Sequence, residues 1–146
     1  MKAAADYAKH IHISASPEWV YDALSSADGF AAWWAPATGS AAEGGALRVT
    51  FAGIEDPLVL QVERAKRPAT ATWNVRGCSF LPDRAGTTAT FTLSPSGDGG
   101  CDVQFQHQGL RPDLECYDMC SAGWDQYVPS LRDHIETGTG NPFRPR

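Results

Sequence analysis

Apolar and polar residues alternate in six short segments of the chain, which is the pattern of half-buried β-strands. The first segment, His10 to Ala15, places Ile11 and Ile13 on one side and His10 and His12 on the other. The apolar positions of the next four are Leu47/Val49/Phe51, Leu58/Leu60/Val62, Ala71/Trp73/Val75 and Ala89/Phe91/Leu93, each preceded by a turn signal of glycine or proline. Strands with one apolar and one polar face predict an antiparallel sheet that is solvated on one side.

The sixth segment follows a strong hairpin signal. The run Gly97-Asp98-Gly99-Gly100 suits a tight turn, because these residue types tolerate positive φ. In the segment after it, Val103, Phe105 and His107 share one face, and Asp102, Gln104 and Gln106 share the other. The register therefore directs His107 to the apolar side of the sheet.

Two short helices are predicted after the first strand. Ser16-Pro17-Glu18 combines a hydroxyl cap, a proline at the first helical position and an acid near the positive end of the helix dipole. Asp28 is interpreted as the cap of a second helix that passes through Phe30, Trp33 and Trp34 and ends before Pro36.

A long helix is predicted near the end of the chain. Apolar residues recur there every three or four positions and form one buried stripe: Tyr117, Cys120, Trp124, Val128, Leu131 and Ile135. Gly138 is well placed to end the helix. Pro129 lies inside the pattern, removes one backbone hydrogen bond and crowds Asp125, so we expect a kink or a break there.

These elements together predict an α+β fold in the order β-α-α-β(5-6)-α. The apolar face of the sheet needs a cover, and the long C-terminal helix is the amphipathic element able to supply it. A curved antiparallel sheet wrapped around one helix leaves a mostly apolar pocket between them. We expect residues 1–146 to form a single domain with a core of about residues 8–138.

Composition narrows the function. The chain of 146 residues carries 12 Lys and Arg against 17 Asp and Glu, a net charge of −5. The basic residues are scattered, so nucleic acid is not an expected partner. No apolar run approaches the ~20 residues of a membrane span, and the first seven residues do not form a signal peptide. We therefore expect a cytoplasmic protein without membrane insertion.

Several stretches in this order resemble the Activator of heat-shock-protein-90 ATPase homologue family. They are the segment from His10 to Leu24 with the later Trp33-Trp34 pair, the Glu43-Gly44-Gly45 turn, the stretches Thr87 to Leu93 and Val103 to Leu110, and Gly123-Trp124 with Leu131 and Glu136-Thr137-Gly138. The resemblance runs from about His10 to Phe143. It implies the START-like (SRPBCC) superfamily, with a helix-grip fold and a central cavity. That superfamily includes lipid carriers, polyketide cyclases and chaperone activators.

The function that this resemblance implies is the binding of a small apolar or aromatic molecule between the sheet and the last helix. The predicted cavity residues are Trp33, Trp34, Phe51, Trp73, Phe105, His107, Cys120, Trp124 and Tyr127. Trp33 and Trp34 are expected to close its mouth. Two alternatives stay open: a cyclase- or dehydratase-like enzyme that uses His107 as general acid/base, and a chaperone-interacting stress-response protein.

His107 also has a simpler interpretation, as a buried neutral histidine hydrogen-bonded to backbone, which is favoured because the sequence offers it no acid partner. Cys116 and Cys120 lie one turn apart and His10 and His12 share a face, but neither pair has enough companions for a metal site. We therefore expect neither metal nor cofactor, and assign no catalytic residue. An exposed edge strand would allow a homodimer.

Overall fold

The computed structural model describes residues 7–51, 57–77, 86–110 and 117–142. Its elements follow the order β1 (Tyr7–Ile13), α1 (Pro17–Ala23), α2 (Ala27–Trp33), β2 (Ala37–Gly39), β3 (Ala46–Val49), β4 (Leu58–Lys66), β5 (Thr70–Gly77), β6 (Thr88–Pro95), β7 (Cys101–Gln108) and α3 (Tyr117–Thr137). The predicted α+β class is confirmed. Cys116, which the sequence places one turn before Cys120, lies outside the described residues.

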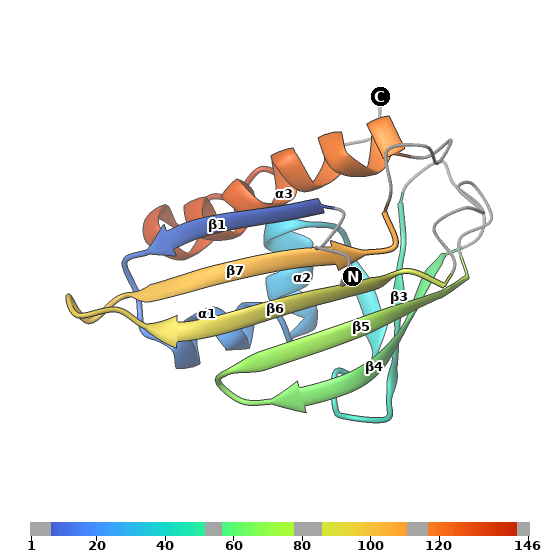
Figure 1. Cartoon of the computed structure of the whole chain (residues 1–146), viewed down its shortest axis with the longest axis horizontal. Helices are drawn as coiled ribbons and strands as arrows, with labels where there is room; N and C mark the ends of the chain where they lie inside the picture. The colour runs from blue at the N-terminus through green and yellow to red at the C-terminus, as the bar shows by residue number, and fades with distance from the viewer. Residues whose placement is uncertain (1–6, 52–56, 78–85, 111–116, 143–146) are drawn as a thin grey trace, which may run out of the picture.

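All seven strands form one antiparallel sheet in the order β1-β7-β6-β5-β4-β3-β2. The sheet is curved, and the helices lie on one side of it, with α3 running alongside the edge strand β1 (Figure 1). The alternation predicted from the sequence matches the observed burial, because Leu47, Leu60, Trp73, Phe91 and Phe105 all face the core. Strand β2 was not predicted, because its three residues are too few to show an alternation.

Both short helices begin at a serine. Ser16 caps α1, and Pro17 occupies the first turn as predicted. The interpretation of Asp28 as the second cap is wrong: Ser26 caps α2, its Oγ accepting a hydrogen bond from Gly29 N at 3.0 Å, while Asp28 lies in the first turn. Gly29 packs against α1, and a Cβ there would lie 2.8 Å from the backbone of Ala23. This contact fixes how tightly the chain turns between the two helices.

Of the kink or break expected at Pro129, the break does not occur, because helix α3 is continuous through that residue. It ends at Thr137, and Gly138, with φ of +84°, donates its N–H to His134 O at 2.9 Å. The residue after the proline, Ser130, is buried and donates its hydroxyl to Trp33 O at 2.8 Å. Ser130 Oγ also accepts a hydrogen bond from Asn141 N at 2.6 Å, so Ser130 joins α2, α3 and the segment that follows α3.

Charged side chains are divided between the two sides of the molecule. Seven acids lie on the described helices, namely Glu18, Asp22, Asp28, Asp118, Asp125, Asp133 and Glu136, and the helices hold one arginine, Arg132. The outer face of the sheet over β3 to β5 exposes the basic residues Arg48, Arg64, Lys66 and Arg76 beside Glu63, and Lys66 Nζ lies 3.7 Å from Glu43 Oε1. Among the described residues, the helical side is therefore acidic, and this part of the outer sheet face carries an excess of basic residues. Within the described part of the chain, no helix has the length and apolar character of a membrane span.

We predict that Phe91→Ala lowers the free energy of unfolding by about 3–5 kcal/mol, because it removes a fully buried ring from the centre of the core. Urea denaturation followed by circular dichroism measures the change. Trp19→Ala is the control: Trp19 is 61% exposed, and its loss should change stability by no more than about 0.5 kcal/mol. Equal losses in the two variants would contradict this description of the core.

Candidate functional site

Aromatic side chains from the sheet, from α2 and its C-terminal cap, and from α3 meet between the sheet and α3. We call them the aromatic cluster: Phe30, Trp33, Trp34, Phe51, Trp73, Phe91, Phe105, Trp124 and Tyr127. Seven of the nine predicted cavity residues belong to it, and His107 and Cys120 lie beside it on β7 and α3. Phe30 and Phe91 were not on the predicted lining, although each lay at an apolar position of its own element.

Trp34 lies at the centre of the aromatic cluster. It stacks on Trp33 and on Trp73, with ring centroids 5.6 and 5.9 Å apart. It also meets Trp124 of α3 at 5.2 Å. On the sheet side, Phe105 approaches Trp124 to 4.4 Å. These distances are those of direct ring contact, so helix and sheet are joined through their aromatic side chains.

The aromatic cluster is closed in this structure. Trp33, Trp34, Trp73 and Trp124 are each no more than 2% exposed, and Tyr127 is half-buried. A ring with almost no accessible surface borders no space as large as a water molecule. A guest could therefore enter among these four indoles only if some of them separated.

A chain of polar groups runs into the edge of the aromatic cluster. His107 is fully buried; its Nδ1 lies 2.8 Å from Trp124 Nε1, and its Nε2 lies 2.7 Å from Thr87 Oγ1. An indole N–H can only donate, so Nδ1 must accept and carries no proton. The histidine is consequently the neutral Nε2–H tautomer, and Nε2–H donates to the Thr87 hydroxyl.

These hydrogen bonds bear on the two interpretations of His107, as an acid/base group and as a buried neutral histidine. The residue is buried and neutral, and its ring nitrogens bond to the side chains of Trp124 and Thr87. Both ring nitrogens are engaged, so proton transfer to a substrate would first require one bond to break. As placed, His107 holds and orients the indole of Trp124.

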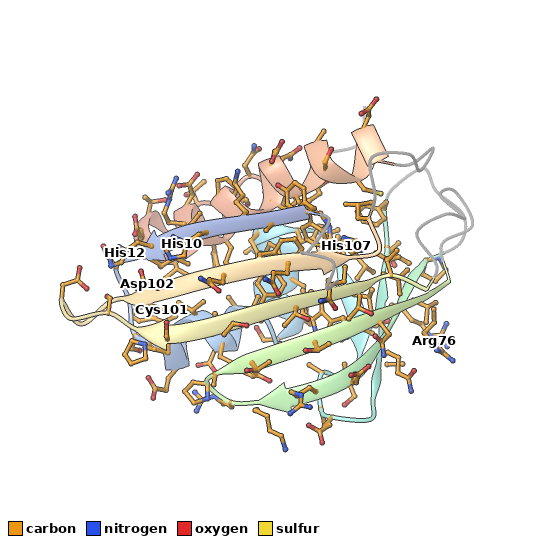
Figure 2. All side chains as sticks on the ribbon, viewed as in Figure 1. His10, His12, Arg76, Cys101, Asp102 and His107 are labelled. Carbon is orange, nitrogen blue, oxygen red and sulfur yellow. The ribbon has the colours of Figure 1, made fainter. Side chains whose placement is uncertain are left out.

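The two other histidines that the sequence singled out lie on the outer surface (Figure 2). His12 Nε2 lies 3.1 Å from Asp98 Oδ2 in the β6–β7 hairpin, and His10 lies 3.9 Å from Asp102 on β7. No set of three or more His, Cys, Asp or Glu side chains among the described residues is arranged to hold a metal. The pairs connect strand β1 to the hairpin and to β7 and carry no evident chemistry.

Asp98 and Cys101 have pKa values that depart from the ordinary ones. The pKa of Asp98 is held far below its usual range, first by the hydrogen bond from Ser96 Oγ, then by that from Gly100 N and by His12. Burial raises the pKa of the Cys101 thiol to about 11, so it stays protonated at neutral pH. A buried, protonated thiol is a poor nucleophile, and Cys101 packs as an apolar residue.

A curved antiparallel sheet closed by one C-terminal helix, with an aromatic interior between them, defines the helix-grip class of START-like proteins. Within that class, the family of Activator of Hsp90 ATPase homolog 1-like proteins matches residues 14–136, and the chain belongs to this family. The resemblance seen in the sequence is thereby confirmed. A comparison with curated proteins finds no match.

Solved structures of similar proteins share this fold. The Aha1 dimer from Colwellia psychrerythraea is 26% identical, with a TM-score of 0.78 over 91% of this chain and 97% of that one. MLL2253 from Mesorhizobium loti is 23% identical, with a TM-score of 0.74 over 89% and 96%. DynU16, a protein of the dynemicin biosynthetic locus, is 19% identical, with a TM-score of 0.71 over 91% of this chain and 48% of its own length.

We predict that His107 is found as the neutral Nε2–H tautomer at neutral pH. Ring ¹⁵N chemical shifts from a long-range ¹H–¹⁵N correlation spectrum separate the two tautomers and the imidazolium. His10, which is exposed, provides the internal reference. A protonated Nδ1 would contradict the bond from Trp124.

We predict that Asp98 contributes stability at neutral pH that is lost in acid. Its pKa is lower in the folded chain than in the unfolded one, where it is about 3.9. The contribution is therefore complete above that value and disappears as the pH falls through the folded pKa. Urea unfolding should separate the wild type from Asp98→Asn at pH 7 and bring the two closer at about pH 2. A difference that grows in acid would have the wrong sign.

Proposed function

We propose that this protein binds a small apolar or aromatic molecule between the sheet and α3, at the aromatic cluster. The observation that carries the proposal is the Trp124–His107–Thr87 chain inside an aromatic interior. Packing alone needs no polar group there, and a polar group that is buried must find hydrogen-bond partners to avoid a free-energy cost. An apolar site with a few convergent polar groups is the usual composition of a small-molecule site.

The chemistry of the lining indicates the kind of guest. Indole and phenyl rings offer flat faces that favour stacking with planar molecules. The indole N–H of Trp124 is a donor that a carbonyl or hydroxyl oxygen of the guest would accept in place of His107. The aromatic cluster and its polar chain hold no charged side chain, so an uncharged guest, or one with its charge outside the cluster, is favoured.

Of the two alternatives, the enzyme requires His107 to give up a hydrogen bond before it acts, and the chaperone partner requires an exposed apolar surface. Within the described residues, Trp19 is the exposed large apolar side chain. Neither alternative gains a specific observation from this geometry.

The Colwellia relative is described as a dimer, so we propose that this chain also forms a homodimer. Light scattering would then give about twice the 15.7 kDa of one chain.

We predict that the protein binds N-phenyl-1-naphthylamine, an uncharged planar fluorophore, with energy transfer from its buried tryptophans. Tyr127→Ala should weaken binding about 3- to 10-fold, because it removes a half-buried ring beside Trp34. Trp19→Phe is the matched control and should not change the affinity. Native mass spectrometry of the freshly purified protein, before and after denaturation, identifies any molecule already bound.

Two outcomes would count against the proposal. The first is an absence of binding by folded wild-type protein in both the fluorescence titration and the mass measurement. The second is binding that Trp19→Phe weakens and Tyr127→Ala does not, because this would place the fluorophore on the outer surface of α1.

A further inference from the structure

We propose that two copies of this chain pair through the outer face of the sheet, the side away from the helices, with β4 of one copy lying over β7 of the other. The inference rests on the homodimer proposed above and names its interface. Two features of this face carry it: a centre without charge, and two flanks of opposite charge.

The centre of the outer face is formed by β5, β6 and β7. Its side chains lie in rows that cross the sheet, because Gln104 pairs with Thr92 and Thr92 with Thr70, and the next rows run parallel to this one. Side chains of the opposite orientation on these strands belong to the core. The outward ones, which we call the polar patch, are Thr70, Thr72, Asn74, Thr88, Thr90, Thr92, Gln104, Gln106 and Gln108.

The polar patch differs from an ordinary solvated surface, of which roughly a quarter to a third is charged residues. The helices of this chain carry seven acids and one arginine on their described positions, whereas the polar patch has no charged residue. Depletion of charge is the compositional mark of the centre of a protein–protein interface. Threonine, asparagine and glutamine can exchange hydrogen bonds there with the same residue types of a second copy.

The flank on the β4 side is basic. Arg64 and Lys66 continue two rows of the polar patch, because they pair with Thr72 and Thr70. Arg48 and Arg76 lie on the same flank, and Glu43 and Glu63 offset two of the four positive charges, which leaves +2 among the described residues.

The flank on the β7 side is acidic. It holds Asp102 of β7 and Asp98 of the β6–β7 hairpin, beside His10 and His12, and with histidine counted as neutral its charge is −2. Figure 2 shows Asp102 and the two histidines at one end of the face and Arg76 at the other. The outer face is therefore complementary in charge to a second copy of itself.

This charge distribution selects one of two twofold arrangements. An axis along the strands, between β5 and β6, lays each basic flank over the partner's acidic flank, whereas an axis across the strands sets like charges together. In the first arrangement Lys66 lies over the row of Gln104, two residues from Asp102. The sheet curves around the helices, so its outer face is convex (Figure 1). Short side chains then meet at the centre, and long basic ones span the wider gap at the flanks.

Light scattering and sedimentation of the full chain over a concentration series test the interface. Thr90→Lys places an unpaired charge at the centre of the polar patch and should weaken dimerisation at least about 100-fold. Gln106→Lys, at an exposed position of the same row, should have the same effect and serves if Thr90→Lys does not fold. Ala122→Lys adds the same charge at an exposed position of α3 and is the matched control, which should remain a dimer. Circular dichroism checks the fold of each variant.

Exchanging two charges tests the direction of the axis. Lys66→Asp and Asp102→Lys should each weaken dimerisation about 10-fold, because each sets like charges together twice in the dimer. The double variant restores opposite charges across the interface and should return to within about threefold of the wild type.

The outcomes separate the two proposals. A wild type that stays monomeric at every concentration would overturn both the homodimer and its interface. A dimer that Thr90→Lys and Gln106→Lys both leave intact would retain the homodimer and overturn the outer face as its interface. Loss of the dimer in these two variants, without recovery in the double charge exchange, would retain the face and overturn the axis along the strands.

Discussion

A single antiparallel sheet has two faces, and this sequence makes only one of them apolar. That face must be covered, and α3 is the element long enough to do it, so the position of α3 determines nearly everything else in the interior. Aromatic rings make this cover: Trp124 packs against Phe105 and Trp34, and Trp34 stacks on Trp73. Ring contacts of this size join the helix to the curved sheet without needing the close backbone approach of two helices. The same contacts place the His107 chain where helix and sheet meet.

How much of this could be predicted depends on the range of the interactions involved. The long strands were found because a period of two is a local property, and the side of His107 followed from it. Strand β2 is too short to carry a period. Serine and aspartate are both good caps, and the choice of Ser26 over Asp28 is made by the contact of Gly29 with Ala23, which sequence spacing does not show.

The contacts within the site were less predictable than the identity of the residues that form it. Seven of the predicted lining residues do meet in the aromatic cluster, because strand and helix periods fix which side they face. Their mutual contacts depend on side-chain rotamers and on the curvature of the sheet. The partners of His107 come from 17 and 20 residues away, and threonine has no pattern that marks Thr87 as one of them. The sequence likewise did not show that α3 continues through Pro129, nor that Ser130 reaches Trp33 O at the end of α2.

The separation of acids on the helices from bases on the outer sheet face has a consequence for how the molecule behaves at a distance. With a net charge of −5, the chain as a whole is drawn towards positive surfaces. On the outer face of the sheet over β3 to β5, Arg48, Arg64, Lys66 and Arg76 outnumber the neighbouring acids Glu43 and Glu63, so among the described residues this part of the face carries an excess of positive charge. Within about a Debye length of 8–10 Å of a charged surface, this asymmetry favours one orientation over the other. This part of the outer sheet face is favoured towards a negative surface and the helical side towards a positive one.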